Sequence, residues 1–255
     1  MFRRRGREAA GQIVTEVVLN ATTQTEVPLS RIQGLIARRM LASKQSKPCF
    51  YLEAKADVTD LMGMRHKLSK ALGVKITSNA FFIHALALAV RRYPLIVGRF
   101  VEPDASRARD AAIEISDGIH VGFAVNTARG LIVPVVKNAE RKSLAEIAAE
   151  EKRLTAGARS NTLTLADLEG ETIALSNLGA YDIDTFLGIV PPPASAILSV
   201  GKVAPAVVAR DGRPSVRKLV SMSLAVDHRI VAGDYAARFL ELVIQELKRP
   251  EQLIA

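Results

Sequence analysis

The stretch SMSLAVDHRIVAGDYAARFL, residues 221–240, joins a strand, a turn and a helix, and the rest of the fold is read outward from it. Apolar residues alternate with small or polar ones up to Val226, which predicts a strand, and from Ala236 onward they recur at helical spacing. Asp227, His228 and Arg229 therefore lie in the turn. Histidine side chains have a pKa of about 6.5 in model peptides, so they exchange protons near neutrality. We expect His228 to be either a general base or a polar residue that only ends the strand.

The chain has 255 residues, of which 49% are hydrophobic, and this composition excludes a disordered protein. Strand and helix patterns continue from about residue 28 to 250 without a linker, so we expect an extended arm at 1–26 and one domain at 27–255. No apolar run reaches the ~18 residues that a bilayer span needs, and we expect no membrane association. The basic N-terminus lacks the apolar core of a secretion signal. We expect a cytoplasmic protein, or a mitochondrial matrix protein in a eukaryote.

A net charge of +9 favours acidic partners such as nucleic acids, phosphorylated cofactors or acidic proteins. No run of Lys and Arg interleaved with aromatic residues is present, so we expect no nucleic-acid partner. Cys49 is the only cysteine, which excludes an intrachain disulfide and a cysteine-based zinc site. His66, His84 and His120 have no second metal ligand at suitable spacing, so we expect no metal and a structural role for each.

Helical periodicity and capping residues predict helices, and short apolar runs between turn residues predict strands. Ser30 and Ser143 are expected to cap helices, and the helix that follows Thr77 is apolar all round and should be buried. Strands are predicted at 49–58, 96–101, 113–116, 119–126, 131–136, 172–175, 194–200 and 215–226. Helices mixed irregularly with hairpin-like strands favour an α/β fold, a two-layer sandwich of a mixed sheet with helices.

A second polar segment follows the predicted strand 172–175, where Ser176, Asn177 and Gly179 lead into a loop that ends in three prolines at Pro193. Such a segment either holds a hydroxyl donor at a fixed point or simply ends the strand. The usual glycine-rich dinucleotide and phosphate loops, the serine-hydrolase elbow and the His-Glu-x-x-His zinc motif are all missing from the chain.

From about residue 27 to 255, the motifs taken in order resemble the catalytic core of the dihydrolipoamide acyltransferases. These are the second component of the 2-oxo-acid dehydrogenase complexes and are related to chloramphenicol acetyltransferase. The segments that carry the resemblance are Val27–Ser30, Ile36–Met40, Ser43–Gln45, Asn79, Gly130–Val136, Asn138–Ala139, Ser176–Gly179, Pro192–Ala194, Asp227–Arg229, Gly233 and Ala236–Phe239.

The resemblance implies transfer of an acyl group between dihydrolipoamide and coenzyme A. His228 would be the general base that removes the thiol proton, and Ser176 would donate a hydrogen bond to the oxyanion. Asn177 and Arg39 would bind the cofactor. The implied partners are coenzyme A, a lipoyl domain absent from this chain and the dehydrogenase components.

Family members place the site between subunits of a homotrimer. The trimers join into particles of 24 or 60 subunits through apolar C-terminal residues, here Leu253 and Ile254. We expect the 24-subunit particle.

The chain also departs from the family pattern. Ala232 stands where aspartate or asparagine is usual, and the lost carboxylate pairs with an arginine in relatives, by position Arg39. Cys49 replaces a histidine and Ala80 an aspartate. Three interpretations stay open: an active acyltransferase core, a structural core that has lost activity, and a free-standing acetyltransferase that acts on a small hydroxyl compound.

Overall fold

The computed structural model describes residues 26–104, 106, 110–250 and 253, so the predicted arm lies outside the described residues except for Glu26. Six strands form the main sheet in the order β1-β10-β9-β8-β4-β7, and β8 pairs in parallel with both β4 and β9 while the other pairs are antiparallel. The strands are β1 (Cys49–Asp57), β4 (Val121–Phe123), β7 (Val135–Val136), β8 (Ile173–Asn177), β9 (Ala196–Arg210) and β10 (Arg213–Asp227). The predicted mixed sheet is confirmed.

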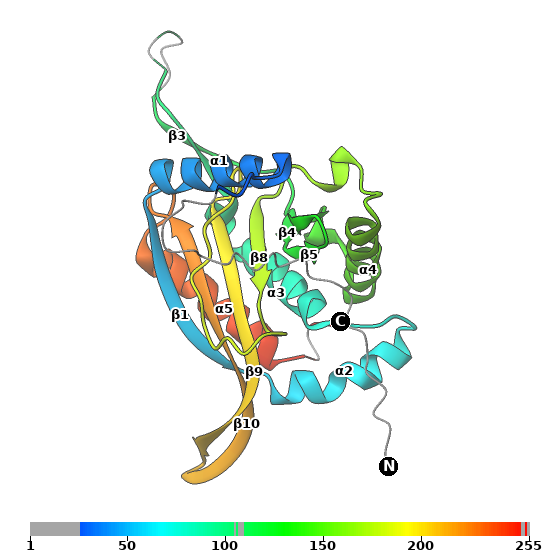
Figure 1. Ribbon diagram of the computed structural model, residues 1–255. Helices are drawn as coiled ribbons and strands as arrows, with labels where there is room; N and C mark the ends of the chain where they lie inside the picture. Colours follow the sequence, from blue (N-terminus) through cyan, green and yellow to red (C-terminus); the bar gives the residue numbers. More distant parts are fainter. Residues whose placement is uncertain (1–25, 105, 107–109, 251–252, 254–255) are drawn as a thin grey trace, which may run out of the picture.

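Helices cover one face of this sheet and form the second layer (Figure 1). They are α2 (Thr59–Ala71), α3 (Ser78–Arg92) and α5 (Gly233–Lys248), with α4 (Leu144–Ser160) beside α3. As its apolar sequence predicts, α3 is buried, and Phe81, Phe82 and Leu86 lie in the main core. Burial of each such side chain contributes about 1.5 to 3 kcal/mol. The packed α3 fixes where the adjacent strand β8 lies.

The opposite face of the sheet is covered by the loop 178–195 instead of helices. Ala174, Ile197 and Ala225 point to this face and pack with Val190 and Ala194 of the loop in a small second core. Neighbouring residues on the same strands belong to the main core, as the period of two along a strand requires. The sheet therefore separates a helix-covered face from a loop-covered face.

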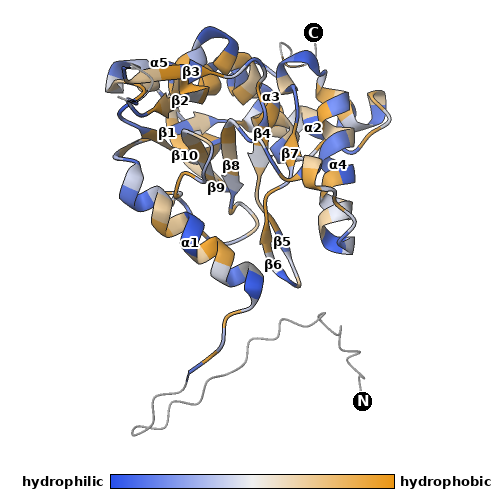
Figure 2. Cartoon of the chain, turned by 90° about the horizontal axis from the view of Figure 1, so that it is seen from above, coloured by the Kyte–Doolittle hydropathy of each residue, from blue (hydrophilic) through white to orange (hydrophobic). Residues whose placement is uncertain are grey.

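The predicted helix caps are confirmed at both serines. Ser30 begins α1 (Arg31–Ser46) in a capping box with Gln33, and Ser143 begins α4 in a capping box with Glu146. Figure 2 shows α1 at the edge of the molecule, away from the main helix layer. Its Leu35 and Leu41 are exposed in the single chain.

Several predicted strand boundaries are wrong. Segment 96–101 starts as the 3-10 turn η1 (Pro94–Val97), and only then forms β2 (Gly98–Val101), which pairs with β3 (Ala112–Ile115). Segments 119–126 and 131–136 each split, adding β5 (Val125–Thr127) and β6 (Gly130–Ile132) as a separate hairpin. Two further 3-10 turns are η3 (Ala139–Arg141) and η4 (Leu165–Asp167).

The hairpin of β9 and β10 is longer than the sequence predicted and projects beyond the sheet (Figure 1). Asp211 and Gly212 form its tight turn, both with positive φ, as two-residue hairpin turns require. Gly201 and Lys202, which follow the predicted strand 194–200, lie inside β9. Glycine fits there because a Cβ on Gly201 would lie 1.9 Å from the carbonyl oxygen of Asp184 in the covering loop.

Leu253, the one described residue beyond Pro250, packs against its own chain. Leu253 is 1% exposed and packs in the main core, so the expectation that this residue waits for a neighbouring subunit is wrong. Ile254 lies outside the described residues. Within the described ranges, no helix combines the length and hydropathy that crossing a bilayer requires.

Candidate active site

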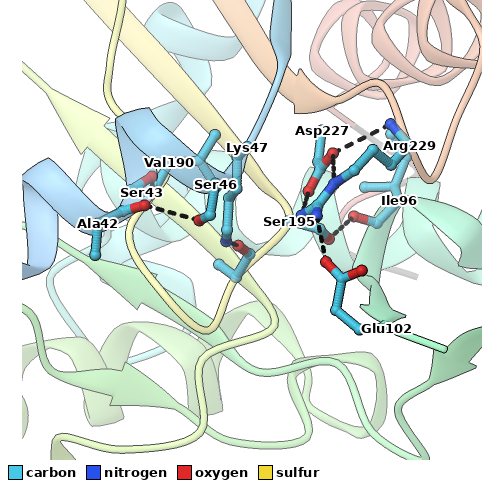
Figure 3. Close-up of polar contacts among 11 residues, drawn as sticks. Ala42, Ser43, Ser46, Lys47, Ile96, Glu102, Val190, Ser195, Asp227 and Arg229 are labelled. Carbon is cyan, nitrogen blue, oxygen red and sulfur yellow. Dashed lines mark hydrogen bonds and ion pairs between the residues drawn. The ribbon is translucent and has the colours of Figure 1, made fainter. Parts of the chain in front are cut away.

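The turn at the end of β10 is held by an ion pair between its first and third residues (Figure 3). Asp227 is 2% exposed, and the Arg229 guanidinium donates to both of its carboxylate oxygens, at 3.0 and 2.7 Å. Arg229 also donates to Glu102 at 3.2 Å and stacks over the ring of Phe100. The bond to Asp227 raises the pKa of Arg229. The residue between them, His228, is exposed.

His228 is fixed by its backbone and by one aromatic neighbour. Its N–H donates to the carbonyl oxygen of Pro48 at 3.0 Å, and its imidazole lies against Phe50 with ring centroids 4.6 Å apart. Among the described residues, no side chain forms a hydrogen bond with either ring nitrogen. The imidazole is therefore free to bind a substrate group.

Ser176 belongs to a row of three serines on the loop-covered face. It pairs with Ser199 on β9, which pairs with Ser223 on β10. The covering loop occupies two of the hydroxyls: Gly188 N–H donates to Ser199 at 3.1 Å, and Ser223 donates to the carbonyl oxygen of Phe186. Within the described part of the chain, the hydroxyl of Ser176 has no such partner. It remains available as a donor.

A single chain does not bring Ser176 and His228 together. The register places Ser176 level with Ser223, two strands away and five residues short of His228. With strands about 4.8 Å apart and about 3.4 Å per residue, the two residues are roughly 20 Å apart. No hydrogen-bonded pair of base and hydroxyl can form within one chain.

A cavity of about 860 Å³ opens on the helix-covered side at Asn177, the residue after Ser176. Four cationic side chains line it: Arg65, Lys75, Lys152 and Arg159. The sequence did not predict this cluster, because its members come from α2, the following loop and α4 and share no motif. Basic side chains around a cavity favour a ligand with several negative charges, such as a phosphorylated cofactor. No described group of three His, Cys, Asp or Glu side chains could hold a metal ion.

Arg39, the position whose carboxylate partner in relatives corresponds to Ala232, lies near a different carboxylate in this chain. Its guanidinium donates to the carbonyl oxygen of Pro192 at 2.5 Å and lies 3.7 Å from Glu171. Glu171 is 4% exposed, and burial raises the pKa of its carboxyl. Because the Arg39 side chain is 47% exposed, solvent weakens this ion pair. Arg39 does not line the cavity at Asn177.

Ala232 is the N-cap of α5, and it has no side chain that can cap the helix. We therefore expect Ala232→Asp to stabilise the fold, since a capping carboxylate contributes about 0.5 to 2 kcal/mol. The melting temperature should rise by a few degrees, about 2 to 4 °C per kcal/mol for a domain of this size. Scanning calorimetry measures the shift, with Ala232→Val as the control that cannot cap. Equal melting temperatures for both variants would contradict the capping role.

A family model described as 2-oxoacid dehydrogenases acyltransferase (catalytic domain) matches residues 21–255. The chain belongs to this family. Among curated relatives, a dihydrolipoyllysine-residue acetyltransferase component of the pyruvate dehydrogenase complex from Rickettsia felis is 31% identical over 98% of this chain. The chain spans between half and two thirds of the lengths of such acetyltransferase relatives, 63% for this one.

Solved structures agree with membership of the acyltransferase family. The Azotobacter vinelandii dihydrolipoamide acetyltransferase is 30% identical with a TM-score of 0.83, over 91% of this chain and 95% of that one. The cubic core of the pyruvate dehydrogenase multienzyme complex is also 30% identical with a TM-score of 0.82, over 91% and 95%. Chloramphenicol acetyltransferase, 14% identical with a TM-score of 0.52 over 82% of this chain and 94% of that one, shares the fold. The predicted fold class is confirmed.

Proposed function

We propose that this chain moves an acyl group between the thiols of dihydrolipoamide and coenzyme A, in the oligomeric core of a 2-oxo-acid dehydrogenase complex. The observation that carries the proposal is the cationic cavity that begins at Asn177, directly after a serine whose hydroxyl has no hydrogen-bond partner among the described residues. A lipoyl domain brings the dihydrolipoyl group, and the dehydrogenase components load and recycle it.

In this reaction His228 takes the proton of the attacking thiol. A free thiol has a pKa near 8.5 and is mostly protonated at neutral pH, so a base is needed to form the thiolate nucleophile. The thiolate attacks the thioester carbonyl, and Ser176 donates a hydrogen bond to the resulting oxyanion. The intermediate collapses, and the departing thiolate takes the proton from His228.

The related structure from Azotobacter vinelandii supports these roles. It belongs to a study of one serine, one histidine and one asparagine in the catalytic mechanism of that enzyme. Its serine and histidine are 52 residues apart, the same separation as between Ser176 and His228. Its asparagine follows the histidine by four residues, where this chain has Ala232.

We assign the cavity at Asn177 to coenzyme A. The cofactor carries several phosphate charges, and Arg65, Lys75, Lys152 and Arg159 would bind them at its wall. Its thiol arm would run past Asn177 toward Ser176. The assignment of Arg39 to cofactor binding rests on the resemblance alone.

The separation of roughly 20 Å between Ser176 and His228 requires that two subunits complete each site. We propose a homotrimer in which the histidine of one subunit faces the serine of the next. Exposed apolar residues support burial of this region between subunits: Leu35, Leu41, Tyr181 and Leu187.

We further propose that eight trimers form a cubic particle of 24 subunits, by analogy with the cubic core that the chain resembles. Removal of Ile254 and Ala255 should reduce the particle to trimers of ~80 kDa, about three times the chain mass, because the contact between trimers loses its apolar residue. This truncation keeps Leu253, whose burial belongs to the folded subunit. Light scattering measures both masses. A trimer in both samples would reject the particle, and a particle in both would reject the role of the tail.

One assay tests the activity. The purified chain is incubated with acetyl-coenzyme A and either dihydrolipoamide or small alcohols of the chloramphenicol type. Acetylation of dihydrolipoamide supports the proposal, and acetylation of the alcohols alone indicates a free-standing acetyltransferase.

Transfer to neither acceptor indicates the second candidate function, a structural core without activity. That candidate is favoured by Ala232, because a methyl group cannot make the hydrogen bonds of an asparagine or aspartate side chain at the same place.

A further inference from the structure

Glu151 is a charged residue on the apolar face of α4. It is 6% exposed and follows Ile147 and Ala148 in the buried row of this helix, whose other members are apolar. Burial raises the pKa of its carboxyl, so the charge is unfavourable at this place. A residue kept at such a cost needs a reason beyond packing.

A chain of hydrogen bonds connects Glu151 to the end of β8. Glu151 accepts from the hydroxyl of Thr77 at 2.5 Å and also bonds the side chain of Asn79. The Oδ1 atom of Asn79 accepts from Nδ2 of Asn177 at 2.7 Å, and Oδ1 of Asn177 accepts from the N–H of Gly179 at 2.8 Å. We name this chain, from Glu151 through Asn79 and Asn177 to Gly179, the amide relay.

The two ends of the amide relay fix its direction. The backbone N–H of Gly179 can only donate, so Asn177 must turn its oxygen toward it and its NH₂ toward Asn79. Asn79 must then present its own NH₂ to Glu151, and an ionised carboxylate can only accept. Each amide therefore has one orientation, set by Glu151 at one end and the strand end at the other.

The negative charge of Glu151 is unfavourable for binding of an anionic ligand in the cavity. It lines the cavity together with Arg65, Lys75, Lys152 and Arg159, and a carboxylate there repels an anionic ligand. Ligand binding alone would favour a neutral residue at this position. Support of the amide relay accounts for the carboxylate, because an ionised carboxylate accepts hydrogen bonds from Thr77 and Asn79 more strongly than a neutral amide would.

We propose that Glu151 is a positioning residue for the transfer reaction, which acts through the amide relay to hold the segment Ser176–Gly179 where the oxyanion forms. The inference rests on the proposed function. Glu151 itself touches no reacting atom. A small displacement of a catalytic donor is costly, since about 1 Å can lower a rate on the order of a hundredfold.

Glu151→Gln tests the proposal, because glutamine keeps the shape and removes the acceptor-only end. We expect kcat to fall about tenfold, because an oxyanion donor that is held less firmly stabilises the transition state less. The KM for coenzyme A should stay equal or fall, because a repulsive charge has left the cavity. A merely structural defect would not lower KM and kcat together. Glu150→Gln makes the same charge change one residue away, where Glu150 pairs with Lys142, and should leave both constants unchanged.

The effect of Glu151→Gln in a Ser176→Ala background shows whether Glu151 acts by positioning the serine. If Glu151 acts through Ser176, Glu151→Gln should cost little in a Ser176→Ala background. An equal tenfold loss in both backgrounds would overturn the proposal. Asn79→Ala breaks the relay without changing its charge. It should lower kcat about as much as Glu151→Gln does, with no fall in KM. This variant tests the proposal if Glu151→Gln does not fold.

A measurement without catalysis keeps this test separate from the proposed function. Hydrogen exchange, followed by mass spectrometry on peptides that cover 176–181, should become faster in Glu151→Gln, and the exchange of peptides from the β9–β10 hairpin should not change. If the wild-type chain transfers no acyl group but exchange at 176–181 still accelerates, the proposed function fails and the relay stands. Unchanged exchange at 176–181 overturns the relay itself.

Discussion

Replacement of His228 by alanine should lower kcat at least a hundredfold while the particle stays assembled. Loss of a positioned general base costs about a hundredfold to ten-thousandfold in rate. The side chain is exposed and its imidazole lies against the ring of Phe50, so its removal opens no cavity in the core. Steady-state rates with acetyl-coenzyme A and dihydrolipoamide measure the effect, and light scattering measures the assembly.

His66→Ala is the matched control for this variant. His66 is also exposed, lies on α2 and has no assigned role, so its removal should leave kcat within a factor of two of the wild-type value. Turnover in His228→Ala equal to that of the control would reject His228 as the base. If the His228→Ala subunits no longer assemble, the turn at the end of β10 has a structural role that we did not assign.

Replacement of Ser176 by alanine should lower kcat between tenfold and a thousandfold. One oxyanion donor is typically worth about 3 to 4 kcal/mol of transition-state stabilisation, and hydroxyls with weaker geometry give less. The hydroxyl has no partner within the described chain, so the free energy of unfolding should hardly change. The KM for both substrates should also remain, because the donor acts on the oxyanion and not on the bound thioester.

Ser215→Ala, on the projecting part of β10, is the control for a serine hydroxyl lost from a strand. Urea denaturation of both variants shows whether their stabilities match. Should Ser176→Ala keep the wild-type kcat, another group must stabilise the oxyanion. A rise in KM without loss of kcat would instead assign Ser176 to substrate binding.

The parts of the fold that follow from local patterns were predicted well. The capped helix α1, the strand β1 and the buried helix α3 agree with their predictions to within a residue or two, because periodicity and caps act over neighbouring positions. The outer half of β9 was missed because alanine, glycine and proline at 201–206 weaken the strand signal. Its pairing with β10 holds it in the sheet.

In the candidate site too, residues that are neighbours in the sequence could be predicted, and residues that meet only in the fold could not. Asp227, His228 and Arg229 are consecutive, so the sequence places the proposed base between the two residues that form the ion pair in the structure. The amide relay joins Asn79, Glu151 and Asn177, which are far apart in sequence and meet only because α3 and α4 pack beside β8. One local signal was present, since Glu151 interrupts an apolar row on α4, and a charge in such a row indicates a buried polar contact.

The close approach of Gly201 to the carbonyl of Asp184 determines how the covering loop can dock. Only a residue without a Cβ fits between β9 and the loop at position 201. A shift of the loop by one residue along β9 would place a side chain there, so the loop can dock in one position only. The backbone N–H of Lys202 donates to the carbonyl oxygen of Ile183 beside it, and this hydrogen bond also holds the loop in that position. The register of the loop against β9 is therefore fixed. This fixed register also decides which loop residues lie over the three serines. A larger residue in place of Gly201 should therefore displace the loop along the whole loop-covered face.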